Sequence, residues 1–504
     1  MASTLVDQLA FLRRYEAALN DGSPTGVTRC FEFLSEDIRC EFTNHIDLVH
    51  FCKMRKHLPE EISSWRTPGD VAPSIIRLYK QLILTKLVDS NYNATDALVE
   101  DLYDVISSEA LEFLRDNSVT FSEDDLIGLK RKCQKILDSK GKCNSEIVLS
   151  VLLKEEETKS KGECKSYAFS HKTVQVMFAA DNVVRRILTH CNVSLNSILA
   201  VTTCGMTHLL EVLLHVVPAL SRFSPHKLEE RWEDLKKALR DAGVIGADNV
   251  RDCVARCSPD HAGMVAEIAA LVADVRWNVC NGRHVAAVVE MLQYGAPRKL
   301  WVHMKAEALR GAPWGALVAA AGSKGVEVWL CLECPDDYEP HDDLLLPLRH
   351  SGVRLGGFIG CVGTCAGVAA LASCVDTGAD LYIHMAAPLD LSVLGGTYEE
   401  LTVYTRPLPP PGPASPTWPL PPSPPPSLYV EGTTEGSWRA VARTIISLAP
   451  PGKRFHRLGL PACRLRAVEL PQLRQFTRDE CLQSTAERRT LLACSSRLNV
   501  VTSE

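Results

Sequence analysis

The sequence predicts a mixed α+β protein that is mostly helical, in which helical domains precede a solenoid of strand–helix units. Residues 1 to about 245 are rich in Leu, Lys, Glu and Asp, and their apolar residues recur at helical spacing. From about residue 246 the composition shifts to Ala, Gly, Val and Cys, and an internal repeat begins. A chain of 504 residues exceeds the size of one hydrophobic core, so several domains are expected.

Composition narrows the class of protein. Apolar residues make up 46% of the chain and charged residues 23%, which is typical of globular proteins. The net charge of −6 gives no electrostatic reason to expect a nucleic acid or an acidic membrane as a partner. The first residues lack the pattern of a signal peptide, and the richest apolar stretch, 209–220, is too short to span a bilayer. The 19 cysteines then indicate reduced thiols and a cytoplasmic protein.

The helical half contains local signals for a smaller module. Ser122 precedes three acidic residues, which is typical of a helix start because the hydroxyl accepts from free amides and acids favour the positive helix end. The charged segment 154–165 predicts the turn of a hairpin. Its two strands are expected over 147–153 and 167–169. Helices followed by such a hairpin and another helix are typical of a winged-helix module.

An internal repeat organises the second half. The segment 300–304, Leu-Trp-Val-His-Met, recurs at 381–385 as Leu-Tyr-Ile-His-Met, and similar segments begin at Val328 and Leu355. These four strand candidates are 26 to 28 residues apart, which is the period of a leucine-rich-repeat horseshoe. Further strands are expected near 275–277 and 457–460, and helices over 314–321, 343–350 and 366–375.

A doubly wound α/β domain is the competing interpretation, because it also alternates strand and helix. The near-identical strands at 300 and 381 favour the solenoid, since a doubly wound domain does not require one strand to copy another. The segment 406–427 contains many prolines, which exclude helix and sheet and predict an extended loop inserted between repeats. This loop could bind an SH3-type partner. A solvated insertion without a partner is the simpler interpretation.

Four segments of the helical half occur in a characteristic order: Asn44–Cys52, Thr67–Leu84, Phe121–Leu126 and Tyr167–Ala180. In this order they resemble motifs of the NACHT-type nucleotide-binding leucine-rich-repeat (NLR/STAND) receptors, and the last resembles the family's Phe-x-His-Lys-Thr-Phe-Gln-Glu-Phe-x-Ala-Ala pattern. The resemblance implies four domains. They are a first helical domain (1–80), a winged helix (81–181), a second helical domain (182–245) and a leucine-rich-repeat-like solenoid (246–504) with the Pro-rich insertion 406–427.

The sequence departs from the family at the nucleotide-binding core. It contains no Gly-x-x-x-x-Gly-Lys-Ser/Thr loop to hold phosphates, and no strand ending in acids precedes the helical domain to hold Mg²⁺. His45 replaces the family proline that packs on adenine, and Val176 and Met177 replace Glu-Phe. We therefore expect the regulatory and repeat half of such a receptor, in a chain that begins after the ATPase core. No cofactor is expected, and ATP or ADP is expected only if an ATPase core is supplied elsewhere.

His171 is the candidate for nucleotide contact. In the family, the histidine of this motif faces the phosphates, and imidazole suits that role because it titrates near neutrality. The competing interpretation is a histidine at a helix start that is hydrogen-bonded locally. Gln175, Phe178 and the two alanines after it are expected to serve helix packing.

The candidate protein-binding residues belong to the repeat strands. In a strand, alternate side chains point to the same face, so His303 and His384 occupy equivalent places in their units. Aromatic side chains at Trp301, Trp329 and Tyr382 are expected on the same concave face, where a protein partner would bind. The competing interpretation is that these are ordinary surface residues of alternating strands.

No chemistry-bearing motif supports an enzyme or a metal site. The pairs Cys331/Cys334 and Cys361/Cys365 have spacings near those of zinc sites, but alternation along a strand sends the first pair to opposite faces. The glycines from 356 to 367 lack a Gly-x-Gly-x-x-Gly fingerprint and are expected in tight repeat turns. No Ser/His/Asp, Cys/His or His-Glu-x-x-His arrangement is evident, so we expect neither enzymatic activity nor a bound metal.

These observations predict a regulatory and recognition protein similar to a fragment of an innate-immune NLR sensor, without its own ATP hydrolysis. One alternative is a standalone leucine-rich-repeat scaffold or inhibitor that binds a protein partner. Another is a doubly wound α/β enzyme that uses the glycines near position 360.

Overall fold

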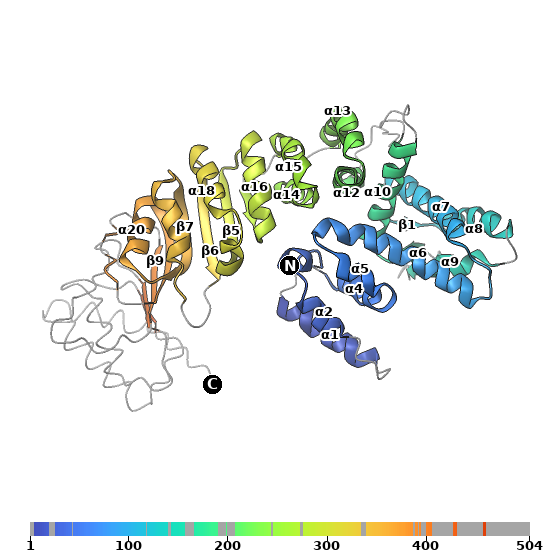
Figure 1. The fold of residues 1–504 in the computed structure, drawn as a ribbon, viewed down its shortest axis with the longest axis horizontal. Helices are drawn as coiled ribbons and strands as arrows, with labels where there is room; N and C mark the ends of the chain where they lie inside the picture. Colours follow the sequence, from blue (N-terminus) through green and yellow to red (C-terminus); the bar gives the residue numbers. More distant parts are fainter. Residues whose placement is uncertain are drawn as a thin grey trace, which may run out of the picture. The chain divides into compact units, whose positions relative to one another are not determined.

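The structure is a computed structural model, and the chain divides into two compact units, residues 1–273 and 274–504 (Figure 1). The first unit is helical apart from three short strands, and the second contains a parallel sheet, so the chain is mostly helical and α+β overall. The residues that it describes are 5–19, 26–42, 44–116, 118–139, 143–156, 166–189, 198, 207–242, 245–272, 276–333, 339–386, 389–391, 393–394, 400–405, 427–430 and 457–459.

The helical unit begins with short amphipathic helices that pack around aromatic side chains. Phe31, Phe42 and Phe51 meet edge to face, with ring centroids 5.1 to 5.8 Å apart, and Trp65 closes the group. Such edge contacts suit the ring quadrupoles and add to the apolar burial. The helices of this part are α1 (Leu5–Leu19), α2 (Val27–Glu32), α3 (Glu36–Arg39), α4 (His45–His57), α5 (Pro59–Ser64), η1 (Pro68–Asp70) and α6 (Val71–Asp89).

A second aromatic group lies where α6 meets the longer helices that follow. Phe178 of α10 contacts Tyr79, Tyr103 and Phe169, with ring centroids 5.0 to 5.9 Å apart. Phe178 is fully buried, and the alanines after it are almost so, which confirms that this part of the motif serves helix packing. The elements here are α7 (Asp96–Arg115), β1 (Thr120–Phe121), α8 (Glu123–Asp138), α9 (Ser145–Leu152), β2 (Leu153–Glu156), β3 (Ser166–Phe169) and α10 (Lys172–Thr189).

The three short strands form an antiparallel sheet in the order β1-β3-β2. Ser122 caps α8 as predicted: its hydroxyl accepts from the Asp125 amide, and the Asp125 carboxylate accepts from the Ser122 amide. The predicted strand over 147–153 is wrong, because residues 145–152 form α9. Asn144 caps this helix, and its buried side chains at 145, 148, 149 and 152 follow helical spacing. The turn segment 157–165 lies outside the described residues.

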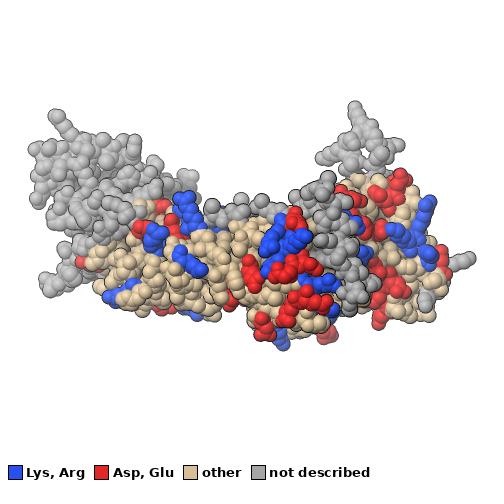
Figure 2. Space-filling view, turned by 90° about the horizontal axis from the view of Figure 1, so that it is seen from above, with Lys and Arg blue, Asp and Glu red and all other residues tan. Residues whose placement is uncertain are grey.

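The rest of the helical unit is joined to its first helices by two arginines. Arg222 donates to the Thr67 hydroxyl at 2.8 Å and pairs with Asp70. Arg256 makes two hydrogen bonds to the Glu41 carboxylate, at 2.8 and 3.2 Å. The helices are α12 (Thr207–Phe223), α13 (Pro225–Asp241), α14 (Ala247–Arg256), α15 (Pro259–Ala266) and η2 (Glu267–Leu271). On the visible face of this unit, Lys and Arg lie among Asp and Glu without an extended area of one sign (Figure 2).

The second unit contains one parallel sheet whose strands follow the chain order. Among the described residues the sheet has eight strands, in the order β11-β10-β9-β8-β7-β6-β5-β4. The strand candidates at 300, 328, 355 and 381 therefore lie side by side in β5 to β8, as predicted. The strands are β4 (Arg276–Val279), β5 (Lys299–Lys305), β6 (Glu327–Glu333), β7 (Arg354–Val362), β8 (Val375–Met385), β9 (Glu400–Thr405), β10 (Ser427–Val430) and β11 (Arg457–Gly459).

The helices between these strands form a layer on one face of the sheet. α16 packs on α18, α18 on η3, and η3 on α20, so they follow one another along the sheet (Figure 1). The strand side chains that face this layer, such as Leu300, Leu330 and Ile383, are fully buried. The helices are α16 (Gly282–Tyr294), α17 (Ala306–Arg310), α18 (Trp314–Ser323), α19 (Asp342–Leu345), η3 (Leu346–His350) and α20 (Cys365–Cys374).

The sheet bears on the competing doubly wound interpretation and differs from expectation in two ways. Its strand order never reverses among the described strands, whereas a doubly wound sheet requires a reversal, so that fold is ruled out for this part. β9 and β10 were not predicted. The compact unit that holds the sheet begins at residue 274, so 247–271 belong with the helices before it. The Pro-rich segment lies outside the described residues except for Ser427, which begins β10.

Candidate functional site

All five predicted protein-binding residues lie on the sheet face opposite the helix layer. Trp301 is opposite Trp329 in the register of β5 and β6. His303 and Tyr382 lie in the next row across the strands, and His384 lies one row further along β8. His303 is exposed and the other four are half-buried, while their neighbours in sequence face the helices and are buried. We call this surface the outer face of the sheet.

Two aromatic stacks stand on the outer face. The rings of Trp301 and Trp329 are parallel within 2°, with centroids 4.9 Å apart. On the other side of β7, His384 stacks on Tyr404 of β9 with centroids 4.5 Å apart and planes 7° apart. Both centroid distances match the spacing of about 4.8 Å between adjacent strands, so the sheet itself sets the stacking.

Charged side chains hold the tryptophan stack. The Arg276 guanidinium lies 5.4 Å from the Trp301 ring centroid, and the Lys299 ammonium lies 5.3 Å from that of Trp329. Glu327 accepts hydrogen bonds from the Trp329 indole at 2.8 Å and from Lys299 at 3.0 Å. Burial raises the pKa of the Glu327 carboxyl, but these two hydrogen bonds and the charges of Lys299 and Arg354 together outweigh it, so the pKa is lowered. Glu327 therefore stays ionised at neutral pH.

Tyr382 is fixed by an acid on the neighbouring strand. Its hydroxyl donates to the Glu400 carboxylate at 2.7 Å, and the Thr402 hydroxyl donates to the same carboxylate at 3.3 Å. The hydrogen bond to Glu400, followed by burial, raises the pKa of Tyr382 to about 12. The phenol is thus neutral at physiological pH, and Glu400 brings a negative charge to this side of the outer face.

Two glycines of β7 make room for the tryptophan stack. Gly356 and Gly357 lie within the strand predicted at Leu355, now β7, and not in a repeat turn, and they stand at a register shift between β6 and β7. A Cβ atom at Gly357 would come 2.5 Å from Cε3 of Trp329, so the indole covers the backbone at this position. Ile359, two residues further on, is the exposed aliphatic side chain between the two stacks. Sequence analysis missed the role of these glycines, because it depends on the pairing of β6 with β7 in the folded sheet.

His171 lies in the helical unit, between β3 and α10. Its Nδ1 accepts from the Thr173 amide at 3.2 Å, which is the local hydrogen bond of the competing interpretation. Burial, followed by the charges of Lys154 and Lys172, lowers the pKa of His171, so its imidazole is neutral at pH 7. Beside it, the Tyr79 hydroxyl bridges Ser170 at 2.8 Å and His50 at 2.9 Å.

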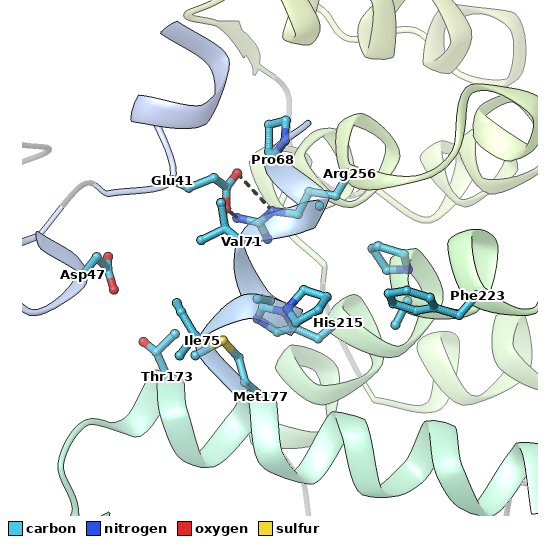
Figure 3. A pocket seen from close by; sticks show the side chains of 15 residues that line it. Glu41, Asp47, Pro68, Val71, Ile75, Thr173, Met177, His215, Phe223 and Arg256 are labelled. Carbon is cyan, nitrogen blue, oxygen red and sulfur yellow. Dashed lines mark hydrogen bonds and ion pairs between the residues drawn. The ribbon is translucent and has the colours of Figure 1, made fainter. Parts of the chain in front are cut away.

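A pocket of about 140 Å³ lies in the helical unit, where three of the four sequence-selected segments meet (Figure 3). Its walls are mainly apolar, and the Glu41–Arg256 ion pair stands at one side. His171 is not among its lining residues. Those are Glu41, Asp47, Pro68, Gly69, Val71, Ala72, Pro73, Ile75, Thr173, Met177, His215, Pro218, Ala219, Phe223 and Arg256.

The titratable groups of this pocket have shifted pKa values. Burial, followed by the charge of Glu41, raises the pKa of Asp47 to about 6. Burial, followed by the charge of Arg256, lowers the pKa of His215 to about 3. At neutral pH the histidine is therefore neutral. No lysine is among the lining residues, and the cation there, Arg256, is paired with Glu41.

The cysteine pairs do not form a metal site in the described part of the chain. Cys361 is buried and Cys365 is exposed, Cys331 is half-buried on the outer face, and Cys334 lies outside the described residues. No group of three or more His, Cys, Asp or Glu side chains there is placed to hold a metal ion.

Comparison with known proteins does not identify a function for this site. No model of a protein family matches the chain, and no curated protein matches it either. Among the helices that the structure describes, none combines the length and the apolar character needed to cross a membrane.

Proposed function

We propose that this protein is the regulatory and recognition part of an NLR-like sensor of the innate-immune type, and that it binds a protein partner through the outer face of its sheet. In this proposal the helical unit is the switch and the sheet unit is the recognition element. The proposal assigns no catalytic step to either unit.

The order of elements in the helical unit supports the switch. α7, β1, α8, α9, β2 and β3 follow one another, and β3 pairs with both β1 and β2 in one antiparallel sheet. This order of elements is typical of a winged-helix module. The motif that resembles the NLR family lies at the end of this module, in β3 and α10.

The order of strands in the sheet unit supports a leucine-rich-repeat-like solenoid. From β4 to β8, each successive unit adds one strand to the sheet and at least one helix to the layer behind it, which leaves the other face to line a binding surface. A solenoid built in this way buries its apolar side chains only against neighbouring units.

The observation that carries the proposal is the outer face itself. Half-buried aromatic rings, stacked in pairs and flanked by charges of both signs, lie on one face of a sheet whose other face is buried from β4 to β9. Aromatic side chains that are held rigidly and partly accessible are typical of protein-binding surfaces. The mixed charge distinguishes this face from a surface for nucleic acid, which requires an excess of positive charge.

Site-specific photo-crosslinking tests the proposal. A photo-reactive phenylalanine analogue replaces His303 on the outer face or, as a matched control, Leu346, which is 48% exposed in η3 on the helix side. We expect one protein to be crosslinked from position 303 and not from 346. The purified partner should then lose at least tenfold in affinity with the Trp329→Ala variant and retain its affinity with Leu346→Ala.

Crosslinks that are equal from the two positions would contradict the proposal, as would an affinity that Trp329→Ala leaves unchanged. Amide hydrogen exchange of the complex separates the proposal from a standalone scaffold. Slower exchange in the helical unit on binding supports a recognition element coupled to a switch. Changes confined to the sheet unit would favour the scaffold.

A further inference from the structure

The pocket of the helical unit has space for a small molecule. Its volume of about 140 Å³ is close to that of the apolar cavities of about 150 Å³ that hold a benzene-sized molecule. Helices from both parts of the unit line it: α4 and α6 from the first part, and α12 and α14 from the last. Phe223 is 59% exposed and lies at the edge of the pocket, so the pocket opens to solvent (Figure 3).

The charged side chains that line the pocket leave one negative charge uncompensated. Glu41 uses both of its carboxylate oxygens to pair with Arg256. Asp47 accepts a hydrogen bond from the Asn44 side-chain amide at 2.6 Å but makes no ion pair with a described residue. Burial, followed by the charge of Glu41, raises the pKa of Asp47 and outweighs the opposite effects of Asn44 and Arg256. The pocket is therefore suited to a cation, and it has no free cation of its own to receive an anion.

A neutral histidine lies in the wall of the pocket between its acidic and its apolar side. His215 is half-buried and makes no hydrogen bond with a described residue. Its pKa of about 3 leaves it uncharged at neutral pH, so it does not repel a cation. In Figure 3, Asp47 and Phe223 lie on opposite sides of the pocket, and His215 and Met177 lie between them. The pocket therefore has an acidic end and an apolar end.

We propose that this pocket binds a small organic cation, in which a protonated amine is attached to one aromatic or branched aliphatic group. The ammonium pairs with Asp47, and the apolar group lies against Met177 and Phe223. This inference goes beyond the proposed function, which assigns no ligand to the helical unit, and it does not depend on the outer face. Nucleotides and carboxylates are disfavoured, because their negative charge would meet Asp47.

A bound ligand should strengthen the packing of the first helices of the unit on the last. Two arginines already join these parts, Arg222 to Thr67 and Asp70, and Arg256 to Glu41. The ligand contacts α4 and α6 as well as α12, so it binds only when these helices are packed together. By mass action it then stabilises that arrangement of the helical unit over any in which the helices separate.

Three probes of similar size test the proposal in ligand-observed NMR titrations of the full chain. 2-Phenylethylamine, 2-phenylethanol and phenylacetate share a phenyl ring, and at about pH 7.5 they are a cation, a neutral molecule and an anion. We expect the amine to bind with a dissociation constant on the order of 1 mM, as suits so small a ligand. It should bind at least about tenfold more tightly than the alcohol or the acid, because it alone forms a charged pair.

The pH dependence of binding identifies the carboxylate. Asp47 has a pKa of about 6, so lowering the pH from about 7.5 to about 5.5 should reduce the affinity of the amine about fourfold. Of the other groups that face Asp47, Glu41 is paired with Arg256, and His215 stays neutral over this range. The amine stays protonated as well. The affinity of the alcohol should therefore remain the same.

Two variants locate the two ends of the ligand. Asp47→Asn should reduce the affinity of the amine at least about tenfold and abolish its pH dependence, while the alcohol binds as before. The matched control is Asp96→Asn, which removes an exposed acid from the first turn of α7, outside the pocket, and should change nothing. Ala219→Leu adds a larger side chain to the wall of the pocket and should weaken both the amine and the alcohol. Circular dichroism checks the fold of each variant.

Equal affinities of the amine and the alcohol at about pH 7.5 overturn the proposal, and so does the absence of amine binding at about 10 mM. An amine affinity that does not fall at the lower pH also overturns it. This measurement uses the wild type, so it decides the question even if Asp47→Asn does not fold. The crosslinks from positions 303 and 346 test the recognition function separately, so either proposal can fail without the other.

Discussion

The indole of Trp329 lies over the backbone of Gly357, its partner in the register of β6 and β7, and leaves no space there for a side chain. This contact links the glycines of β7 to the aromatic surface of β5 and β6. β7 has glycine at positions 356 and 357, and the absence of side chains there lets the Trp329 ring lie flat in its stack with Trp301.

Gly357→Ala should therefore displace the indole and destabilise the sheet unit by about 1–3 kcal/mol, the usual effect of adding a methyl group where none fits. Urea unfolding followed by tryptophan fluorescence measures the loss. Gly315→Ala is the control, because a Cβ at this exposed position in α18 meets nothing within 4 Å. A Gly357→Ala variant as stable as the wild type, with unchanged fluorescence, would show that the contact is not constraining.

The sequence contains enough information to predict the strand order of β5 to β8, because each strand alternates buried and outward side chains at a regular period. β9 follows β8 without a full repeat, so the period that revealed the other strands misses it. The register shift in β7 cannot be read from the period either. It depends on the fit of Trp329 against Gly357, which is a contact between different strands.

The error over 147–153 has a different cause. A short, almost continuous apolar run fits a buried strand and a helix equally well by periodicity alone. The cap at Asn144 and the burial of Val148, Leu149 and Leu152 decide for the helix, and burial depends on tertiary packing. The pocket beside Arg256 was not predicted, since it depends on tertiary contacts between segments more than 200 residues apart, such as the ion pair of Arg256 with Glu41.

His50 should make the helical unit sensitive to acid. Burial, followed by the charges of Lys53 and His171, lowers the pKa of His50 from 6.5 to about 4. The unfolded chain therefore binds a proton at His50 more readily than the folded chain does. The contribution of neutral His50 to the unfolding free energy is complete above about pH 6.5 and is lost as the pH falls toward 4. The loss in unfolding free energy is on the order of 3 kcal/mol.

His50→Gln should reduce the fall in stability across this pH range. Chemical unfolding of the wild type and of His50→Gln at several pH values gives their unfolding free energies. The difference between the two proteins cancels the opposite contribution of Asp47, whose pKa is raised and which both proteins contain. The exposed His226→Gln variant controls for the removal of one histidine. Parallel pH profiles for the wild type and His50→Gln would refute this role for His50.

The ion pair of Arg256 with Glu41 should be energetically coupled. Its two hydrogen bonds are at 2.8 and 3.2 Å, and both side chains are largely buried, with 28% and 19% of their surface exposed. A double-mutant cycle with Glu41→Gln and Arg256→Gln should give a coupling energy of about 1–3 kcal/mol. The exposed pair of Arg13 with Glu32, at 3.9 Å, is the control, and its coupling should be close to zero. Equal coupling in the two cycles would mean that the partly buried pair does not fasten α14 to the first helices.

The isolated chain should not bind ATP or ADP tightly. His171 is the residue that the family resemblance connects with phosphate, but its Nδ1 already accepts from the Thr173 amide, and the sequence has no phosphate-binding loop. Titration calorimetry with either nucleotide and Mg²⁺ should show no binding at micromolar concentrations, and His171→Ala should leave that result unchanged. Micromolar affinity that His171→Ala abolishes would instead show that His171 contacts a nucleotide in this chain without a separate ATPase core. Because the imidazole is neutral at pH 7, such binding would also strengthen as the pH is lowered through the pKa of His171.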